Sequence, residues 1–360
     1  MFYQAPGMMS RILGISLYNK KGRAELIKQL KDETFSRITV SFYRYVEIKN
    51  LQEFRDSLYR KLSELNVLGR IYIAYEGVNA QISIPEHNQE KTIKYIHSIS
   101  SLNGVEIKNA IVDGDSFFKL TIKVKNEIVA YGIDENEYDM NIVGKHLEPD
   151  EFNRYIDNED TVVVDIRNHY ESEVGHFRGA LKPDVERSQE LLPEIKRLLT
   201  NQEDKKILLY CTGGIRCEKA SSYLIKNNFK DVNQLSGGVI NYANSIRSRK
   251  KETKFIGKNF VFDNRLGEQI TDDIISACHI CQSKSNEHRN CANDLCHILF
   301  IQCDSCLEKY SGCCSNECLN YISLSEEGKQ DEKKSFLEYN SKRLGKNIKP
   351  KLYNIRSNIK

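Results

Sequence analysis

A chain of 360 residues is long enough to form two or three domains, each with its own hydrophobic core. Charged residues make up 29% of the chain and the formal net charge is +3, so the protein as a whole is only mildly basic. The sequence has no apolar run near the roughly 18 residues that a membrane span needs, and residues 1–20 lack the pattern of a secretory signal. We therefore expect a cytoplasmic protein without a membrane partner. The oligomeric state is not encoded in any pattern that we can identify.

An N-terminal domain is predicted over residues 12–133, where strand-like and helix-like segments alternate. Apolar residues at helical spacing predict helices at 51–65 and around 93–99. Segments rich in β-branched and aromatic residues predict strands at residues 38–45, 70–75, 78–84 and 117–124. The resulting order, βαββαβ, is typical of a ferredoxin-like domain, in which an antiparallel sheet carries two helices on one face.

A central domain is predicted over residues 145–250, after a charged stretch at 134–144. It begins with a helix near 149–158 and continues as alternating apolar strands and helices. This alternation indicates a mostly parallel, buried sheet of the α/β class. Ligands of such sheets bind beyond the carboxyl ends of the strands, so the residues that follow each strand are the first candidates for a site.

The segment Cys211-Thr212-Gly213-Gly214-Ile215-Arg216, called here the Cys211 loop, occupies such a position. It follows the apolar run 207–210 and precedes the helix-like stretch 218–227. A Gly-containing turn into a helix points several backbone N–H groups at the loop centre, which favours a thiolate, a persulfide or an oxyanion. We expect the pKa of Cys211 to fall and its thiol to act as a nucleophile. Without that context, Cys211 would be interpreted as a small buried hydrophobe.

Two neighbours of Cys211 have open roles. Arg216 is expected to face the loop and to stabilise a thiolate or an anionic intermediate, or to form a salt bridge with Asp165 or Glu171, and these roles are compatible. Cys217 is a packed residue at the first turn of the helix or a partner that resolves an oxidised Cys211.

The motifs around the loop resemble those of a rhodanese domain. An apolar strand at 161–167 ends in Asp-x-Arg, Glu171 follows, and Gly-His-x-x-Gly-Ala occupies 175–180. The stretch 235–239, Leu-Ser-Gly-Gly-Val, lies downstream of the loop. Within that superfamily, a six-residue loop is similar to those of sulfur-handling members, whereas related phosphatases have a seventh residue. By this resemblance Asp165, Arg167 and His176 are scaffold residues, and we assign them no catalytic role.

A cysteine-rich segment is predicted over residues 255–322. The chain has 11 cysteines, an odd number that argues against a disulfide framework, and nine of them lie between 278 and 318. Two Cys-x-x-Cys units 22 residues apart have the spacing of tetrahedral zinc sites. The candidate ligands form four pairs: Cys278 and Cys281, Cys291 and Cys296, Cys303 and Cys306, and Cys314 and Cys318.

In a cross-braced arrangement, the first and third pairs hold one Zn²⁺ and the second and fourth hold another, in a structural role. Cys313 can replace Cys314, and three histidines are spare ligands: His279, His288 and His297. An iron–sulfur cluster and a set of packed, reduced cysteines are the alternatives. Residues 323–360 are expected to form a basic, flexible tail, since 342–360 has seven Lys and Arg and no acidic residue.

Taken as a whole, residues 12–322 resemble the rhodanese-domain tRNA uridine(34) hydroxylase family. The resemblance is carried by Glu-Gly-Val-Asn-Ala at 76–80, the long stretch 210–220 around Cys211, Phe-Val-Phe-Asp-Asn-Arg at 260–265 and the cysteine-rich segment. It implies that O₂-dependent oxidation converts the wobble uridine of certain tRNAs to 5-hydroxyuridine. It also implies that Cys211 is the catalytic cysteine and that the partner is the anticodon region of tRNA.

The residues alone support only part of that function. No two-His-one-carboxylate triad and no flavin-binding glycine fingerprint is recognisable, so the oxygen chemistry rests on the resemblance. Cys211 can add to C6 of uracil, or it can carry oxidised sulfur. A sulfurtransferase with a Cys211 persulfide is the alternative activity, and a non-enzymatic binding module is a third possibility. Candidate RNA contacts are residues 247–251, the basic tail, Tyr43 and Tyr45.

Overall fold

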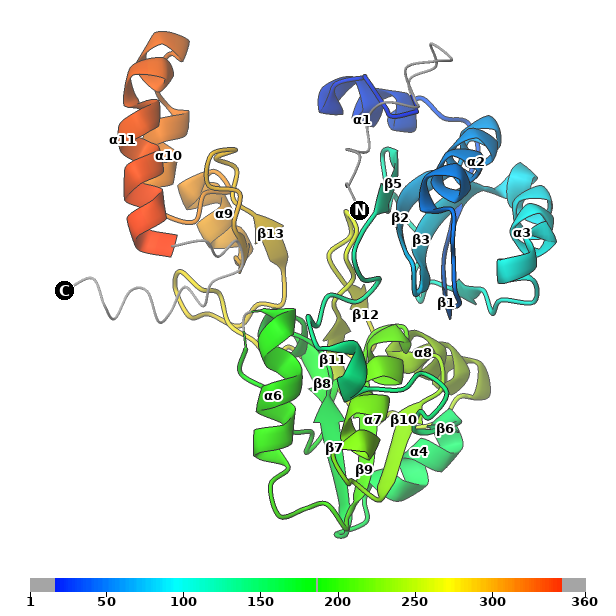
Figure 1. The fold of residues 1–360 in the computed structure, drawn as a ribbon. Helices are drawn as coiled ribbons and strands as arrows, with labels where there is room; N and C mark the ends of the chain where they lie inside the picture. The colour runs from blue at the N-terminus through cyan, green and yellow to red at the C-terminus, as the bar shows by residue number, and fades with distance from the viewer. Residues whose placement is uncertain (1–16, 186, 345–360) are drawn as a thin grey trace.

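The computed structural model describes residues 17–185 and 187–344. It shows an N-terminal domain above a central domain, with the cysteine-rich segment and its helices to one side (Figure 1). Within the described ranges, no helix combines the length and the hydrophobicity of a transmembrane span. The predicted fold class, a ferredoxin-like domain followed by an α/β domain and a cysteine-rich segment, is confirmed.

The N-terminal domain is a five-stranded sheet with α2 and α3 packed on one face (Figure 1). Val40 and Phe42 of β1 pack in one core with Leu58 and Leu62 of α2, whereas the alternate Tyr43 reaches the central domain. The elements are α1 (Arg23–Lys31), β1 (Arg37–Tyr45), α2 (Leu51–Glu64), β2 (Leu68–Ala74), β3 (Gly77–Pro85), α3 (Gln89–Ser98), β4 (Lys108–Asn109) and β5 (Leu120–Val124). Short 3₁₀ turns lie at Glu86–Asn88, Ser100–Leu102 and Glu135–Glu137.

The last strand of this domain differs from the expectation. The strand order is β4-β1-β3-β2-β5, and β5 pairs in parallel with β2 rather than antiparallel beside β1. The place beside β1 is taken by β4, which has only two residues and makes a short antiparallel pair. The sheet is mixed because β5 is parallel to β2 whereas the other pairs are antiparallel. The pairing of β4 could not be predicted, because two residues leave no sequence pattern.

The central domain is built on a parallel sheet with the order β6-β10-β9-β7. Helices α6 and α7 contribute to the core on one face, and α4 and α8 to the core on the other. The carboxyl end of β9 leads directly into Cys211, as predicted. The elements are β6 (Lys145–Leu147), α4 (Pro149–Ile156), β7 (Thr161–Asp165), α5 (His169–Ser172), β8 (Gly175–Phe177), α6 (Ser188–Leu198), β9 (Lys206–Tyr210), α7 (Ile215–Lys226), β10 (Asp231–Leu235) and α8 (Gly238–Arg249).

The cysteine-rich segment is joined to the central domain by a sheet. Its first strand pairs antiparallel with β8, so the two regions share the small sheet β12-β11-β8. A second hairpin, β13–β14, forms a separate two-stranded sheet in the cysteine-rich segment. The elements are β11 (Phe255–Asn259), β12 (Glu268–Gln269), β13 (His288–Asn290), β14 (Leu299–Ile301), α9 (Asp304–Tyr310), α10 (Asn316–Ile322) and α11 (Glu326–Leu344).

Helix α11 departs from the flexible tail expected over 323–360. Its Phe336 and Leu344 are buried in the same cluster as five of the cysteines. Only these two side chains of the 19-residue helix are buried, so the sequence shows no clear apolar stripe. Residues 345–360, which include most of the expected basic tail, lie outside the described residues.

A buried lysine joins the N-terminal and central domains. Lys219 of α7 is fully buried, and its Nζ lies 2.8 Å from Glu76 Oε2 and 3.1 Å from Glu127 Oε2. Both carboxylates belong to the N-terminal side of the interface, next to the turn between β2 and β3 and after β5. A buried ammonium needs such partners, because desolvation without them is costly.

We expect the Lys219→Met variant to be less stable by about 3 kcal/mol, because two partly buried carboxylates lose their cation. Chemical denaturation of the purified protein measures the difference. Lys226→Met, on the same helix but exposed, is the matched control and should unfold as the wild type does. Equal denaturation midpoints for the two variants would contradict the role assigned to Lys219.

Candidate active site and metal centres

The Cys211 loop lies between β9 and α7 and is shaped by two glycines. Gly214 has φ +96°, and its N–H donates a 3.1 Å hydrogen bond to Cys211 Sγ, which is fully buried. Gly238 has φ +67° at the start of α8, where a Cβ atom would stand 2.5 Å from the carbonyl oxygen of Cys211. Only glycine lets α8 approach this closely, and the N–H of Val239 then donates to that same carbonyl oxygen.

The thiol of Cys211 is acidic although it is buried. Burial is the largest single influence and raises its pKa, but three opposing contributions bring the pKa down to about 6. These are a hydrogen bond from the Cys217 thiol, the positive charge of Arg216, and the backbone N–H groups of residues 216 and 217. The pKa of Cys217 moves the other way, well above its usual value, through burial and the neighbouring Cys211 sulfur. Cys211 is therefore mainly a thiolate at neutral pH.

Arg216 is held by a fully buried carboxylate. Its two terminal nitrogens lie 2.6 and 2.7 Å from the two oxygens of Glu171, and one also donates to Thr212 Oγ1 at 3.1 Å. Of the two salt bridges considered from sequence, the one to Glu171 forms, whereas Asp165 pairs with Arg167. Burial raises the pKa of Glu171, but the guanidinium outweighs it and the net shift is downward. Arg216 therefore keeps a fixed positive charge beside the sulfur.

His176 is part of the scaffold, as its motif indicates. Its Nδ1 lies 2.9 Å from the carbonyl oxygen of Ser172, and its Nε2 lies 3.1 Å from Lys182 Nζ. Burial, followed by the positive charge of Lys182, lowers its pKa. The ring is therefore mostly neutral at pH 7 and is engaged with backbone rather than with Cys211.

A cavity of about 350 Å³, called here the loop cavity, separates the Cys211 loop from the open face of the N-terminal sheet. This volume lies in the usual range for small-molecule sites. Thr212, Gly213 and Arg216 form its wall on the loop side. Its other lining residues include six aromatic and two further basic residues: Phe42, Tyr43, Tyr72, Phe117, Tyr170, Phe262, Arg70 and Arg265.

The far end of the loop cavity carries a carboxyl group that sequence reasoning missed. Glu268 Oε1 accepts hydrogen bonds from Arg265 and from the backbone N–H groups of Ile111 and Val112. Its Oε2 is buried without a hydrogen-bond partner, and burial raises the pKa of this carboxyl. The stretch 260–265 had been noted as a family motif, but only the fold brings it opposite the Cys211 loop.

The two tyrosines proposed to stack bases instead connect the domains. Tyr43 Oη donates to Glu218 Oε1 at 2.8 Å, and Tyr45 Oη donates to the carbonyl oxygen of Ile215 at 3.3 Å. Tyr43 still contributes to the wall of the loop cavity, where Lys108 Nζ lies 4.6 Å from its ring centre.

The basic run at 247–251 is also largely engaged within the protein. Arg247 donates to the carbonyl oxygen of Ile111 at 2.7 Å. Arg249 and Lys251 both pair with Asp150, each at 2.7 Å. These contacts leave the run with less free charge than its sequence indicates.

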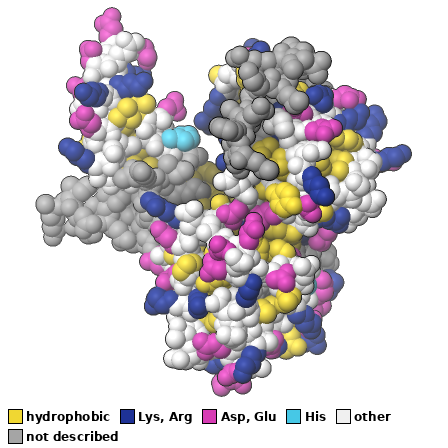
Figure 2. All heavy atoms as spheres, in the orientation of Figure 1, with side chains coloured by type: hydrophobic (Ala, Val, Ile, Leu, Met, Phe, Trp, Pro, Cys, Tyr) yellow, Lys and Arg dark blue, Asp and Glu magenta, His cyan; other side chains and the backbone are white. Residues whose placement is uncertain are grey.

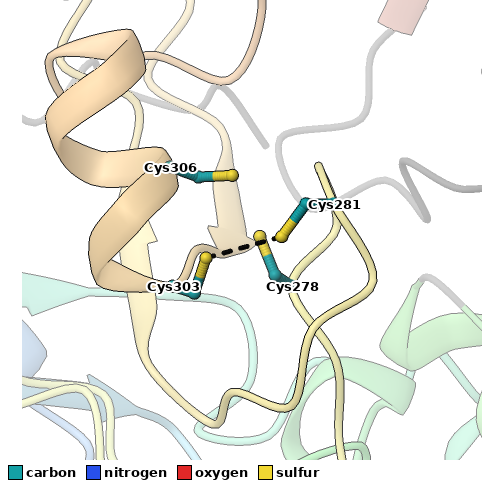
Figure 3. A group of neighbouring side chains, drawn as sticks. All are labelled: Cys278, Cys281, Cys303 and Cys306. Carbon is teal, nitrogen blue, oxygen red and sulfur yellow. Dashed lines mark hydrogen bonds between the residues drawn. The ribbon is translucent and has the colours of Figure 1, made fainter.

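The eight candidate ligand cysteines form two groups of four in the cross-braced pairing predicted from their spacing. One group is Cys278, Cys281, Cys303 and Cys306 (Figure 3), and the other is Cys291, Cys296, Cys314 and Cys318. Within each group all sulfur atoms lie within 4.8 Å of one another. Cys314 belongs to the second group and Cys313 does not. No histidine joins either group among the described residues, and His279 contacts Glu173 instead.

The sulfur spacing fits a tetrahedral metal ion. Closest sulfur pairs are 3.5 Å apart for Cys281 and Cys303 and 3.7 Å apart for Cys314 and Cys318. Four thiolates at a Zn–S distance of about 2.3 Å would stand about 3.8 Å apart. The two groups differ in burial, because all four cysteines of the second are buried whereas Cys281 of the first is exposed. Both groups can hold a metal ion.

Comparisons with known proteins agree with this architecture. Family models match at residues 37–128 (UPF0176 acylphosphatase like domain), 148–245 (rhodanese-like domain) and 256–319 (rhodanase C-terminal). A protein of Leptospira interrogans is 49% identical over 93% of this chain and 92% of its own length. Proteins of Photorhabdus laumondii and Cronobacter sakazakii are 43% and 46% identical, over 94% and 86% of this chain and 94% and 90% of their own.

All three relatives are named tRNA uridine(34) hydroxylase. The chain belongs to the tRNA uridine(34) hydroxylase family. The family resemblance found in the sequence is thus confirmed over nearly the whole chain. The chemistry of this family member has to be sought in three features of the structure: the Cys211 loop, the loop cavity and the two cysteine groups.

We expect the Cys217→Ala variant to raise the pKa of Cys211 above about 6, because the thiol that donates to the sulfur is lost. The pH dependence of iodoacetamide alkylation, followed at Cys211 by peptide mass spectrometry, measures this pKa, since alkylation slows as the thiolate is protonated. Cys217→Ser keeps a hydroxyl donor and should stay closer to the wild type. An unchanged pH profile in Cys217→Ala would show that Cys217 does not tune the sulfur.

Proposed function

We propose that this protein hydroxylates C5 of uridine 34 in the anticodon of tRNA, in the cytoplasm, with O₂ as co-substrate and Cys211 as the catalytic cysteine. The observation that carries the activity is the 43–49% identity, over most of the chain, to relatives named for it. The low pKa of Cys211 and the aromatic, partly basic loop cavity support the assignment of the site.

A thiolate at neutral pH can act on uracil as a nucleophile. Addition of Cys211 Sγ to C6 moves the C5–C6 π electrons into an enolate and makes C5 electron-rich. After C5 has taken an oxygen atom, loss of the C5 proton and expulsion of the thiolate restore the double bond. Overall, one atom of O₂ enters the base and the other leaves as water, which consumes two electrons and two protons from an external reductant. In a second route, O₂ and the same two electrons and two protons convert the Cys211 thiolate to a sulfenate and water. The sulfenate then passes its oxygen to C5, which regenerates the thiolate.

Arg216 has the position of an electrostatic stabiliser in either route. Its guanidinium is fixed by Glu171 and Thr212, so it does not have to reorganise when negative charge develops at the reacting centre. It also lines the loop cavity, within reach of a bound anion or enolate. Glu171 acts through Arg216 and is a positioning residue rather than a catalytic one.

The two cysteine groups are proposed to hold one structural Zn²⁺ each. Tetrathiolate sites with no open position are typical of structural zinc, and the sulfur spacing supports this assignment. The aliphatic core of the segment is small, so bound metal would supply much of its folding free energy.

We expect a strain that lacks the gene for this protein to lose 5-hydroxyuridine or its derivatives from total tRNA, and only wild-type protein to restore them. Cys211→Ser should restore none, since a hydroxyl has no comparable acidity. Nucleoside mass spectrometry measures the product. A partial fall still supports the proposal, because a second pathway can supply the same nucleoside. A persulfide mass on Cys211 with unchanged nucleosides would favour the sulfurtransferase instead.

We expect the purified protein to contain about two zinc ions per chain, one for each tetrathiolate group. Cys318→Ser should reduce the zinc content to about one and should lower the thermal stability of the protein. Elemental analysis and a melting curve test both points, and Cys313→Ser is the matched control because Cys313 belongs to neither group. Equal zinc contents in the two variants would contradict the assignment.

A further inference from the structure

A second cavity, called here the outer groove, lies next to the loop cavity. Its volume is about 550 Å³, and four residues line both spaces: Arg70, Phe117, Phe262 and Asp263. Helix α1 and the residues before β5 form one side of the groove, and Asn290, His297 and Leu299 form part of the other. In the space-filling view, Lys and Arg side chains lie both on the lobe that carries α11 and on the N-terminal domain (Figure 2). The loop cavity thus adjoins the outer groove, with these four residues between them.

The outer groove is predominantly basic. Arg23, Lys31 and Lys119 are exposed along it, and Arg70 lies at its junction with the loop cavity. Two carboxylates also line it, Asp115 and Asp263. Asp263 is already paired with Arg265, whose Nη2 lies 2.5 Å from its Oδ2. The remaining positive charge suits a polyanion that runs along the groove.

Aromatic rings stand among these charges. Phe118 has Arg23 and Lys119 near its ring, at 5.7 and 5.6 Å from the ring centre. Phe262 is 37% exposed at the junction of the two cavities, and Arg216 lies 5.9 Å from its ring centre. Partly exposed rings next to cations are the features with which proteins bind unpaired nucleotides, by stacking on bases and neutralising phosphates.

We propose that the outer groove binds single-stranded RNA, namely the nucleotides next to the target uridine, and that Phe262 stacks on the base beside it. This proposal rests on the proposed function, since it takes the RNA to be an anticodon loop. The target base then leaves the stack and enters the loop cavity, while its neighbours stay outside. Phe262, between both spaces, separates the one base that reacts from those that only bind.

The second cysteine group supports one side of this groove. Asn290 and His297 line the groove and directly adjoin Cys291 and Cys296, two cysteines of that group. The hairpin β13–β14 closes between them, with Asn290 paired to Leu299. Metal bound by this group would therefore hold this wall of the groove in place.

The charge of the groove is tested by an Arg23→Gln, Lys31→Gln, Lys119→Gln triple variant. Binding of a fluorescent anticodon stem-loop RNA is measured by anisotropy over a range of salt. We expect about tenfold weaker binding or more, and a salt slope smaller by about 2, because three phosphate contacts to a single strand are lost. The matched control is Arg60→Gln, Lys91→Gln, Lys94→Gln, on the helices that cover the opposite face of the N-terminal sheet.

The stacking role is tested by Phe262→Leu against Phe262→Tyr. Loss of one base–aromatic stack should weaken binding of the same RNA about tenfold in Phe262→Leu, whereas Phe262→Tyr keeps the ring and should bind as the wild type does. The pH profile of Cys211 alkylation, measured in each variant, reports whether the loop itself is intact.

Wild-type binding by both the triple variant and Phe262→Leu, or an equal loss in the control variant, would overturn the proposal. Failure of the groove proposal can be distinguished from failure of the proposed function, because the RNA-binding measurement does not require the enzyme to react. If RNA binding follows the groove variants while tRNA from the deletion strain keeps its 5-hydroxyuridine, only the hydroxylase assignment fails. If the deletion strain loses 5-hydroxyuridine while the groove variants bind RNA as the wild type does, only the groove assignment fails.

Discussion

The ion pair between Glu171 and Arg216 is the interaction on which the site depends. A thiolate in a fully buried position is unfavourable unless donors and a cation surround it, and a guanidinium there needs a counter-charge of its own. Glu171 supplies that charge through two short hydrogen bonds, and its own backbone position is set by the turn after β7. The loop, with left-handed Gly214, and α8, with left-handed Gly238, then close around the sulfur. The hydrogen bond from the Cys217 thiol and the charge of Arg216, which Glu171 balances, thus lower the pKa of a fully buried cysteine.

Helix α7 connects the Cys211 loop to the N-terminal domain. Its first turn ends the Cys211 loop, and the next residues hold the N-terminal domain: Glu218 accepts from Tyr43, and Lys219 binds Glu76 and Glu127. The same helix therefore fixes both the sulfur and the sheet that faces it. Because the N-terminal sheet covers one face with α2 and α3, its other face is free to form the wall of the loop cavity. The loop cavity thus forms between the two domains, and residues of both line it.

What could be predicted from the sequence was local or regularly spaced. The loop could be identified because strand, glycines and helix follow each other within a few residues, and the cross-braced cysteines because zinc ligands recur at fixed intervals. The parallel pairing of β5, the helix at 326–344 and the engaged state of residues 247–251 were not predictable in this way. Each depends on contacts far apart in the chain: β5 with β2, Phe336 with the cysteines, and Arg249 with Asp150. The position of Phe262 and Glu268 across the loop cavity from the Cys211 loop was not predictable for the same reason. The cavity wall is assembled from three regions far apart in the chain, which leave no periodic pattern in the sequence.

The two cysteine groups differ in what can offset the negative charge of their thiolates. With one Zn²⁺ bound as proposed, four thiolates would leave two net negative charges, which need water or a cation nearby. The first group lies near the surface, with Cys281 exposed, so solvent can screen it. The second is wholly buried, and there Arg343 of α11 places both terminal nitrogens 3.6 Å from Cys314 Sγ. Helix α11 therefore contributes to the second cysteine group. Its Phe336 packs in the same core, and the guanidinium of its Arg343 offsets negative charge on the sulfur atoms. The buried group is also the one that adjoins the outer groove, since Cys291 and Cys296 are next to Asn290 and His297 in the chain.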